Sequence, residues 1–252
     1  MLLLMLASAA TESGQVSEFE QVVADRLAER AVPGERVWLK SGQRQFLGLY
    51  MAPPPDAPQR VVILLHGFGG HPDWPEVIQP LRTRLPALGW GTLSIQLPRL
   101  SLQASQADEA EMPKRVWPRI QSATAWLTAR GIKPVALVGY GFGAAVGARH
   151  LGLHNKEIGA FVAISLQIPS HLAAPVNFPK SLETIKAPVL DIYAAGDGAM
   201  VLLQAPDREL WGRKNKARAF DRIVIADAGA GFHGREDELA GRIVEWLNVN
   251  AR

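Results

Sequence analysis

Four short segments of the chain combine glycines with residues that could do chemistry. They are His66-Gly67-Phe68-Gly69-Gly70, Gly139-Tyr140-Gly141-Phe142-Gly143, Gly196-Asp197 and Gly231-Phe232-His233-Gly234. An imidazole paired with a carboxylate can act as a general base. Backbone N–H groups in a glycine-rich loop can hold an anionic oxygen. These residue types could therefore supply a general base and hold an anionic oxygen.

Each segment comes shortly after a run that is typical of a strand in a parallel sheet. The runs are Val61 to Leu65, Val135 to Val138, Val189 to Tyr193 and Arg222 to Ala226. Open α/β sheets bind ligands outside the carboxyl ends of their strands. We therefore expect the four segments to meet at one edge of the sheet.

Helical spacing alternates with these strands. Helices are predicted over 18–30, 75–88, 114–130, 144–151, 201–211 and 236–249, and further strands over 91–97 and 160–165. Residues 101–112 are expected to be a loop, and 169–188 a proline-containing excursion. Two early strands, Val37 to Leu39 and Gln45 to Tyr50, flank a Ser41-Gly42 turn and predict an antiparallel start to the sheet. The pattern predicts a single α/β domain with a mainly parallel central sheet and helices on both faces.

The order of the four segments resembles the α/β-hydrolase superfamily over roughly residues 36–250. That resemblance implies an oxyanion loop at His66 to Gly70 and a nucleophile elbow at Gly139 to Gly143. It also implies a triad acid at Asp197 and a triad histidine at His233. The N-terminal helix and expected export are similar to an uncharacterised branch of exported bacterial α/β-hydrolase-like proteins.

The chain departs from the superfamily pattern at the nucleophile position, which holds Gly141. Glycine has no side chain to attack a carbonyl, so the usual acyl-enzyme route is closed there. Glycine adopts a positive φ without penalty, so the elbow geometry can survive the loss. The sequence therefore predicts a non-catalytic protein with a degenerate triad, in which Asp197 and His233 are relics. The oxyanion loop, together with Tyr140 and Phe142, would bind a small molecule. Alternatively, the protein would have another envelope protein as its partner.

Other interpretations of these residues stay open. An active, esterase-like hydrolase could use His233 and Asp197 to activate water, or recruit Ser165 as a displaced nucleophile. Equally, Asp197 could cap a helix and His233 could bond within a turn. His66 is expected to orient the glycine loop, and Tyr140 and Phe142 are more typical of packing than of catalysis.

A dinucleotide site is the weakest alternative. Gly139-x-Gly141-x-x-Ala144 after a strand matches the phosphate-binding fingerprint of such sites. That fingerprint needs an acidic residue at the end of the next strand for the ribose. The strand instead ends at Ser165-Leu166-Gln167, so no cofactor is expected.

No metal site is expected either. The chain has no cysteine, which excludes disulfides, thiolate metal sites and a cysteine nucleophile. His150 and His154 stand four residues apart near a helix end, a spacing that could bind a metal. Because no third ligand accompanies them, a solvated helix end is the preferred interpretation.

The N-terminus predicts export. Residues 1–6 are apolar and precede Ala7-Ser8-Ala9-Ala10, which is typical of the back half of a signal peptide. We expect residues 1–10 to be a signal-peptide remnant, 11–35 a helical extension and 36–252 the hydrolase-like domain. The expected location is periplasmic or secreted, with the cytoplasm as the alternative.

The number and distribution of charged residues do not indicate a nucleic-acid partner. The chain has 27 Lys and Arg against 24 Asp and Glu, a net charge of +3 over 252 residues. There is one local basic segment, Arg213 to Arg218, and it is more typical of a solvated helix end than of a nucleic-acid-binding surface. No segment reaches 18 consecutive apolar residues, so no transmembrane helix is expected.

Overall fold

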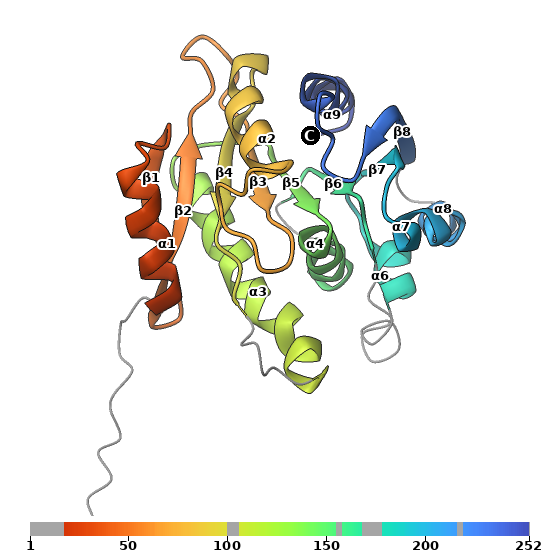
Figure 1. Ribbon diagram of the computed structural model, residues 1–252, viewed down its shortest axis with the longest axis horizontal. Coiled ribbons are helices and arrows are strands. Elements are labelled where there is room, and N and C mark those ends of the chain that lie inside the picture. Colours follow the sequence, from red (N-terminus) through yellow and green to blue (C-terminus); the bar gives the residue numbers. More distant parts are fainter. Residues whose placement is uncertain (1–17, 100–105, 155–157, 168–177, 216–218, 252) are drawn as a thin grey trace, which may run out of the picture.

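The computed structural model describes residues 18–99, 106–154, 158–167, 178–215 and 219–251. Within these residues, eight strands form one sheet in the order β1-β2-β4-β3-β5-β6-β7-β8 (Figure 1). The first hairpin and the β2–β4 pair are antiparallel, and every later pairing is parallel. The predicted fold class, including the antiparallel start, is confirmed.

The strands match the apolar runs of the sequence. They are β1 (Glu35–Ser41), β2 (Arg44–Met51), β3 (Val61–Leu65), β4 (Gly91–Ile95), β5 (Val135–Tyr140), β6 (Ala160–Ile164), β7 (Val189–Gly196) and β8 (Phe220–Gly229). All residues of β3, β4 and β6 are buried, as a parallel sheet covered on both faces requires.

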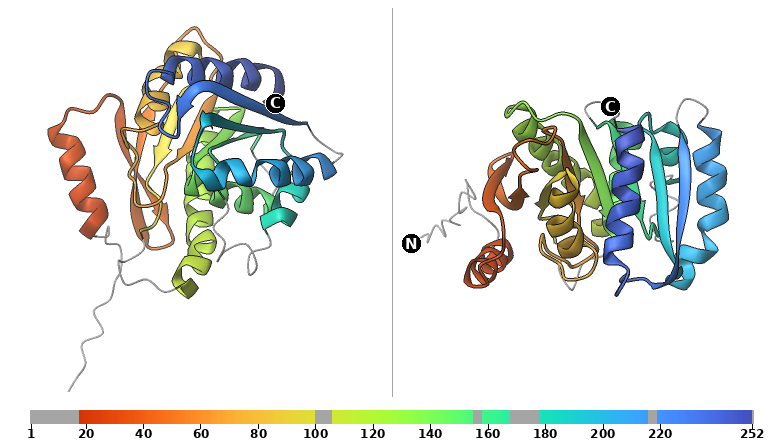
Figure 2. Two further views of the ribbon diagram at one scale, coloured as in Figure 1. Left: turned by 45° about the vertical axis from the view of Figure 1, so that its right-hand side comes forward. Right: turned by 90° about the horizontal axis from the view of Figure 1, so that it is seen from above.

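The helices lie in two layers around this sheet. They are α1 (Glu18–Glu29), α2 (Ile78–Arg84), η1 (Pro86–Leu88), α3 (Gln106–Thr128), α4 (Phe142–Leu153), α6 (Phe178–Thr184), α7 (Ala199–Leu203), α8 (Ala205–Lys214) and α9 (Glu236–Asn250). On one face α2 and α9 lie side by side, and α3 and α4 cover the other (Figures 1 and 2).

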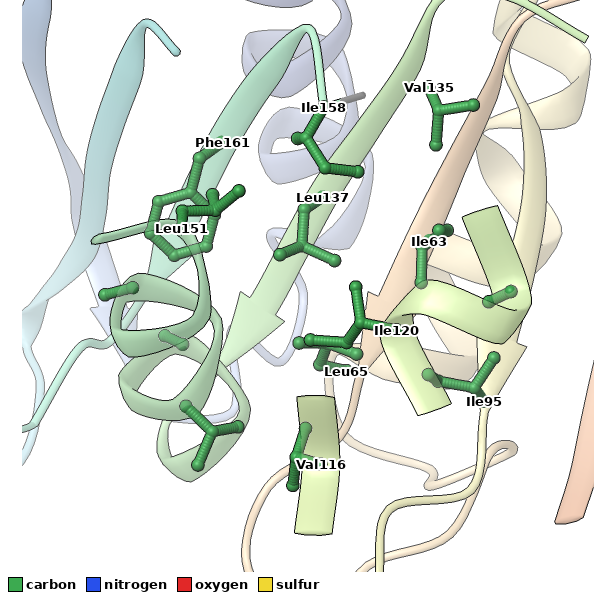
Figure 3. Packing of buried hydrophobic residues seen from close by; sticks show 14 of the residues in the cluster. Ile63, Leu65, Ile95, Val116, Ile120, Val135, Leu137, Leu151, Ile158 and Phe161 are labelled. Atoms are coloured by element: carbon green, nitrogen blue, oxygen red, sulfur yellow. The ribbon is translucent and has the colours of Figure 1, made fainter. Parts of the chain in front are cut away.

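Alternation along β3 divides its side chains between the two layers. Ile63 and Leu65 pack under α3, whose Val116 and Ile120 point toward them (Figure 3). Val62 and Leu64 face the opposite way, into the cluster that α2 and α9 complete. A five-residue run without a polar position is therefore what the two-sided core demands.

Three helices differ from their predicted extents. The expected loop over 101–112 is wrong from Gln106 onward, because α3 begins there and buries Met112 with Val116 on the helix's inward face. The predicted helix over 75–88 is shorter, and Pro86 begins a separate 3₁₀ turn. The predicted helix over 201–211 is two helices, α7 and α8, with Pro206 in the first turn of the second. Contact of its inward face with the core extends α3 toward its N-terminus. Proline residues limit the helices predicted over 75–88 and 201–211.

The N-terminal helix α1 is part of the packed structure. Its Val23 and Leu27 pack on Leu47 and Leu49 of β2. Its Glu20 is buried and pairs with Arg119 of α3, a helix of the opposite face. The expected signal segment, residues 1–10, lies outside the described residues. In the described part of the chain, no helix combines the length and apolarity that crossing a bilayer needs.

Candidate functional site

The junction between β5 and α4 is a tight strand-turn-helix elbow. Gly141 caps the helix with φ 53° and ψ −112°. A Cβ at Gly139 would lie 2.5 Å from the backbone of Gly143 and Ala144, and one at Gly143 would lie 2.2 Å from the Leu65 carbonyl oxygen. Close packing of strand and helix thus accounts for the outer two glycines of Gly-x-Gly-x-Gly without any phosphate ligand.

The central glycine differs from its neighbours. A Cβ at Gly141 would meet no atom within 4 Å. Its positive φ is the strained conformation expected of a nucleophile elbow, and glycine adopts it freely. Gly141 therefore combines a left-handed backbone conformation with open space, and it has no side-chain group that could attack a carbonyl.

The glycine loop after β3 is held by a buried histidine. Nε2 of His66 accepts a hydrogen bond from the Leu97 backbone N–H at 2.9 Å, and its Nδ1 donates to the Gly67 carbonyl oxygen at 2.8 Å. Burial lowers the pKa of His66 to about 4, so the ring is neutral. With both ring nitrogens bonded to backbone groups, His66 fixes the start of the glycine loop against the end of β4.

Aromatic residues of the two loops pack together beside Gly141. Phe68 is 62% exposed and meets Phe142 edge to face, with ring centres 5.5 Å apart. The ring of Tyr140 lies 3.5 Å from the position of a Cβ on Gly67. The site thus presents an apolar aromatic surface at the edge of the sheet.

Tyr140 also links the elbow to the loop that carries His233. Its hydroxyl donates to the Ala230 carbonyl oxygen at 3.3 Å. Burial and the negative charges of Glu76 and Asp197 raise the pKa of Tyr140 to about 12, so its hydroxyl stays protonated. Tyr140 therefore holds the loops after β3, β5 and β8 at the same edge.

Asp197 is buried at the end of β7, and its carboxylate accepts hydrogen bonds from groups close to it. One carboxylate oxygen accepts from the Ser165 hydroxyl at 2.6 Å and from the Ala194 N–H at 3.2 Å. The other accepts from the Gly198 N–H at 2.8 Å. Ser165, at the end of β6, has a positive φ of 49°. These bonds tie the ends of β6 and β7 together.

His233 lies on the surface of the same edge. Its side chain is 75% exposed, and its Nε2 lies 4.0 Å from a carboxylate oxygen of Glu76. In the part of the chain that the structure describes, no hydrogen bond joins His233 to Asp197 or to Ser165. The relic roles of Asp197 and His233 remain a prediction, and their direct pairing is not formed in this arrangement.

Two neighbours of the site were not anticipated from the sequence. Glu76 lies in the stretch expected to be helical, and no pattern marked it as the acid beside His233. The Ser165–Asp197 contact depends on the adjacency of β6 and β7, which composition and spacing do not give.

The histidine pair on α4 differs from its sequence interpretation. His150 is only 7% exposed, so the idea of a solvated helix end is wrong for this residue. Burial and the neighbouring His154 lower the pKa of His150 to about 4. Within the described residues, no group of three or more His, Cys, Asp or Glu side chains is placed to hold a metal ion.

Comparisons with known proteins agree with this architecture. The chain matches a family described as "Protein of unknown function (DUF3530)" over residues 7–114 and 101–249, and it belongs to that family. No curated protein matches its sequence.

Solved structures show the fold. A dienelactone hydrolase from Anabaena variabilis superposes with a TM-score of 0.69 at 20% identity, covering 87% of this chain and 99% of that one. An esterase from Pyrococcus furiosus gives 0.66 at 18% identity, covering 90% and 96%. A putative dienelactone hydrolase from Klebsiella pneumoniae gives 0.68 at 16% identity, covering 85% and 98%. The chain has the α/β-hydrolase fold.

Proposed function

We propose that this protein is a non-catalytic α/β-hydrolase-fold protein that binds a small carbonyl or carboxylate compound beside Gly141. One observation carries the proposal: the elbow keeps its conformation and its open space while the nucleophile is absent. The first N–H groups of α4 point out of the helix at this place and favour an oxygen ligand.

The rest of the site supports binding more than turnover. Asp197 is engaged with Ser165 and backbone N–H groups, and His233 lies beside Glu76. A triad needs nucleophile, base and acid in hydrogen-bond contact. Phe68 and Phe142 supply an exposed aromatic surface for the apolar part of a ligand.

The ligand class comes from the fold relatives. Solved structures of this fold include a dienelactone hydrolase and an esterase, and the names of these proteins refer to lactone and ester chemistry. A protein of this fold that lacks the nucleophile would retain the part of such a site that binds the carbonyl group.

The first experiment measures turnover and binding separately. Hydrolysis of a panel of short activated esters is compared for the wild type and His233→Ala, and we expect background rates from both. A high wild-type rate that depends on His233 would overturn the non-catalytic assignment. Binding of the matching carboxylates is followed by ligand-observed NMR, with Phe68→Ser as the variant expected to weaken it. An absence of binding across the panel would leave the envelope-protein alternative.

A second candidate function has its own observation. The Ser165 hydroxyl donates to Asp197 at 2.6 Å beside the elbow, which is the contact a displaced nucleophile would use. Ser165 is only 4% exposed, and its described contacts include no imidazole. Ester hydrolysis lost in Ser165→Ala but retained in His233→Ala would favour this alternative.

We also propose that the protein acts outside the cytoplasm. The proposal is supported by the apolar residues 1–6 and the Ala-Ser-Ala-Ala sequence that follows. Native material is expected to begin near Ala10 or Thr11. N-terminal sequencing that found an intact Met1 would count against it.

A further inference from the structure

The edge of the sheet that carries the elbow has two carboxylates without a basic partner. Burial, and after it the negative charges of Glu76 and Asp197, raise the pKa of Tyr140. In the part of the chain that the structure describes, neither carboxylate forms an ion pair with a lysine or an arginine. This edge is therefore locally acidic, although the whole chain has a net charge of +3.

The histidines of the glycine loop do not offset these charges at neutral or higher pH. Burial lowers the pKa of His66 to about 4, and burial also lowers the pKa of His71 in the same loop. Nε2 of His233 lies 4.0 Å from a carboxylate oxygen of Glu76, which is too far for a hydrogen bond. The Glu76 carboxylate is therefore available to a charged group from outside the protein.

Glu76 is placed to meet a ligand, whereas Asp197 is not. The side chain of Glu76 is 45% exposed, but Asp197 is buried and accepts hydrogen bonds from the protein. Glu76 lies beside the loop that carries His233, and the Tyr140 hydroxyl bonds to the same loop. Because Tyr140 directly precedes Gly141, the half-exposed carboxylate borders the surface around the elbow.

The aromatic surface beside the elbow also suits a positive charge. Phe68 is 62% exposed, and its ring meets that of Phe142 edge to face. The face of a phenyl ring attracts a cation, and quaternary ammonium groups are recognised in this way. The arginines that lie over aromatic rings in the described part of the chain use other rings, so they do not compete for Phe68 or Phe142.

We propose that the site selects compounds that join a carbonyl group to a cationic ammonium group, and that Glu76 determines this selection. The inference rests on the proposed function, because it takes the carbonyl group to lie beside Gly141. Glu76 and the ring of Phe68 attract the ammonium group, and an anionic group at the same place is repelled by both carboxylates. An attraction between charges that are partly exposed to water changes affinity only a few-fold. Glu76 therefore governs which ligand is preferred rather than whether a ligand binds.

The experiment compares three methyl benzoates that differ only in the para substituent. A trimethylammonio group carries a positive charge, a tert-butyl group is its neutral isostere, and a sulfonate group is negative. Binding to the full chain at about pH 8 is measured by ligand-observed NMR. We expect the cationic ester to bind about threefold or more tightly than the sulfonate ester, and we expect added salt to reduce this difference.

Glu76→Gln removes the charge and keeps the size of the side chain. It is expected to bind the cationic ester about threefold less tightly and the sulfonate ester more tightly than the wild type does. Its affinity for the tert-butyl ester is expected to be unchanged, which also reports that the site is folded. Glu245→Gln, on α9 with a side chain that is 72% exposed, is the matched control and is expected to bind all three esters like the wild type.

The outcomes distinguish this inference from the proposed function. Suppose that the wild type binds the tert-butyl ester but does not discriminate between the two charged esters, or that Glu76→Gln keeps the wild-type preference. Either result would overturn the selection by charge and leave the proposed function standing. Failure of the wild type to bind any of the three esters would overturn the proposed function, and this inference with it.

Discussion

At the scale of single residues, Gly141 combines the conformation of an elbow with the absence of a side chain. The elbow conformation belongs to the backbone, and it is fixed by the packing of β5 against α4. The attacking group belongs to one side chain. Glycine at this position avoids the strain that a side chain would have at a positive φ. Under the function proposed above, the site serves as a binding surface.

The cost of restoring a side chain at this position can be measured. Gly141→Ser is expected to lower the free energy of unfolding by about 1–2 kcal/mol, the usual penalty for a side chain at positive φ. Gly42→Ser is the matched control, because Gly42 has φ 61° and open space but lies in the β1–β2 turn. Urea denaturation of the two variants is expected to give similar losses. A much larger loss at Gly141 would show that the space beside the elbow is filled.

Ester hydrolysis by the same variant tests how much of the site survives. Gly141→Ser is expected to hydrolyse a short activated ester faster than the wild type, because the Phe142 N–H and the glycine loop can stabilise an oxyanion. The gain is expected to disappear when His233→Ala is added. A folded Gly141→Ser protein with no gain would mean that His233, 4.0 Å from Glu76, does not reach the new hydroxyl.

His66 makes stability depend on pH. Its pKa is about 4 in the folded protein against an ordinary value of 6.5, so the unfolded chain takes up the proton first. Stability is therefore full above pH 6.5 and is lost as the pH falls toward 4, by about 2–3 kcal/mol at pH 4.5. Unfolding free energies at pH 7 and 4.5 are expected to differ less for His66→Gln than for the wild type. Equal pH dependence in His66→Gln and the wild type would contradict this prediction.

At the scale of elements, the sequence predicted those strands and helices whose limits depend on neighbouring residues alone. The strand Val61–Leu65 was predicted to the residue, because five apolar positions in a row fit a strand buried on both faces. The start of α3 was not predicted. Its first turns are polar and contain Pro113, and only contact of Met112 with the core shows why the helix continues there.

The elbow junction gives an element-scale prediction. Gly143→Ala would place a Cβ 2.2 Å from the Leu65 carbonyl oxygen, a backbone atom that cannot move without shifting β3. The loss of unfolding free energy is expected to be about 3 kcal/mol or more. Gly141→Ala, two residues earlier with open space, is expected to lose only about 1–2 kcal/mol. Urea denaturation compares the pair, and equal losses would mean that α4 can move away from β3.

At the scale of the whole molecule, the sequence predicted that the four glycine-containing loops share one edge of the sheet, but not the contacts among them. Strand order places the loops after β3, β5, β7 and β8 at one edge, and the predicted parallel sheet was enough for that. The partners of each side chain depend on which strands are neighbours and on loop paths. Asp197 bonds to Ser165 because β6 lies beside β7, and His233 lies near Glu76 because the loops after β3 and β8 approach each other.

The connection between the two faces of the sheet is also a property of the whole molecule. Arg119 of α3 pairs with the buried Glu20 of α1 and donates to the Gln96 carbonyl oxygen at 2.8 Å. Its guanidinium also lies over the ring of Phe46 in β2. A single side chain thus joins the N-terminal helix, the end of β4 and the opposite helical layer.

Removing one partner of this ion pair is expected to loosen α1 first. Arg119→Met removes the guanidinium that pairs with the buried Glu20 carboxylate, and breaking a buried ion pair costs about 3–5 kcal/mol. Because α1 otherwise packs mainly through Val23 and Leu27, limited proteolysis is expected to cut within 18–34 in the variant before the central sheet unfolds. The double variant Glu20→Leu with Arg119→Met removes both charges and is expected to recover most of the resistance. An Arg119→Met protein as resistant as the wild type would show that apolar packing alone holds α1.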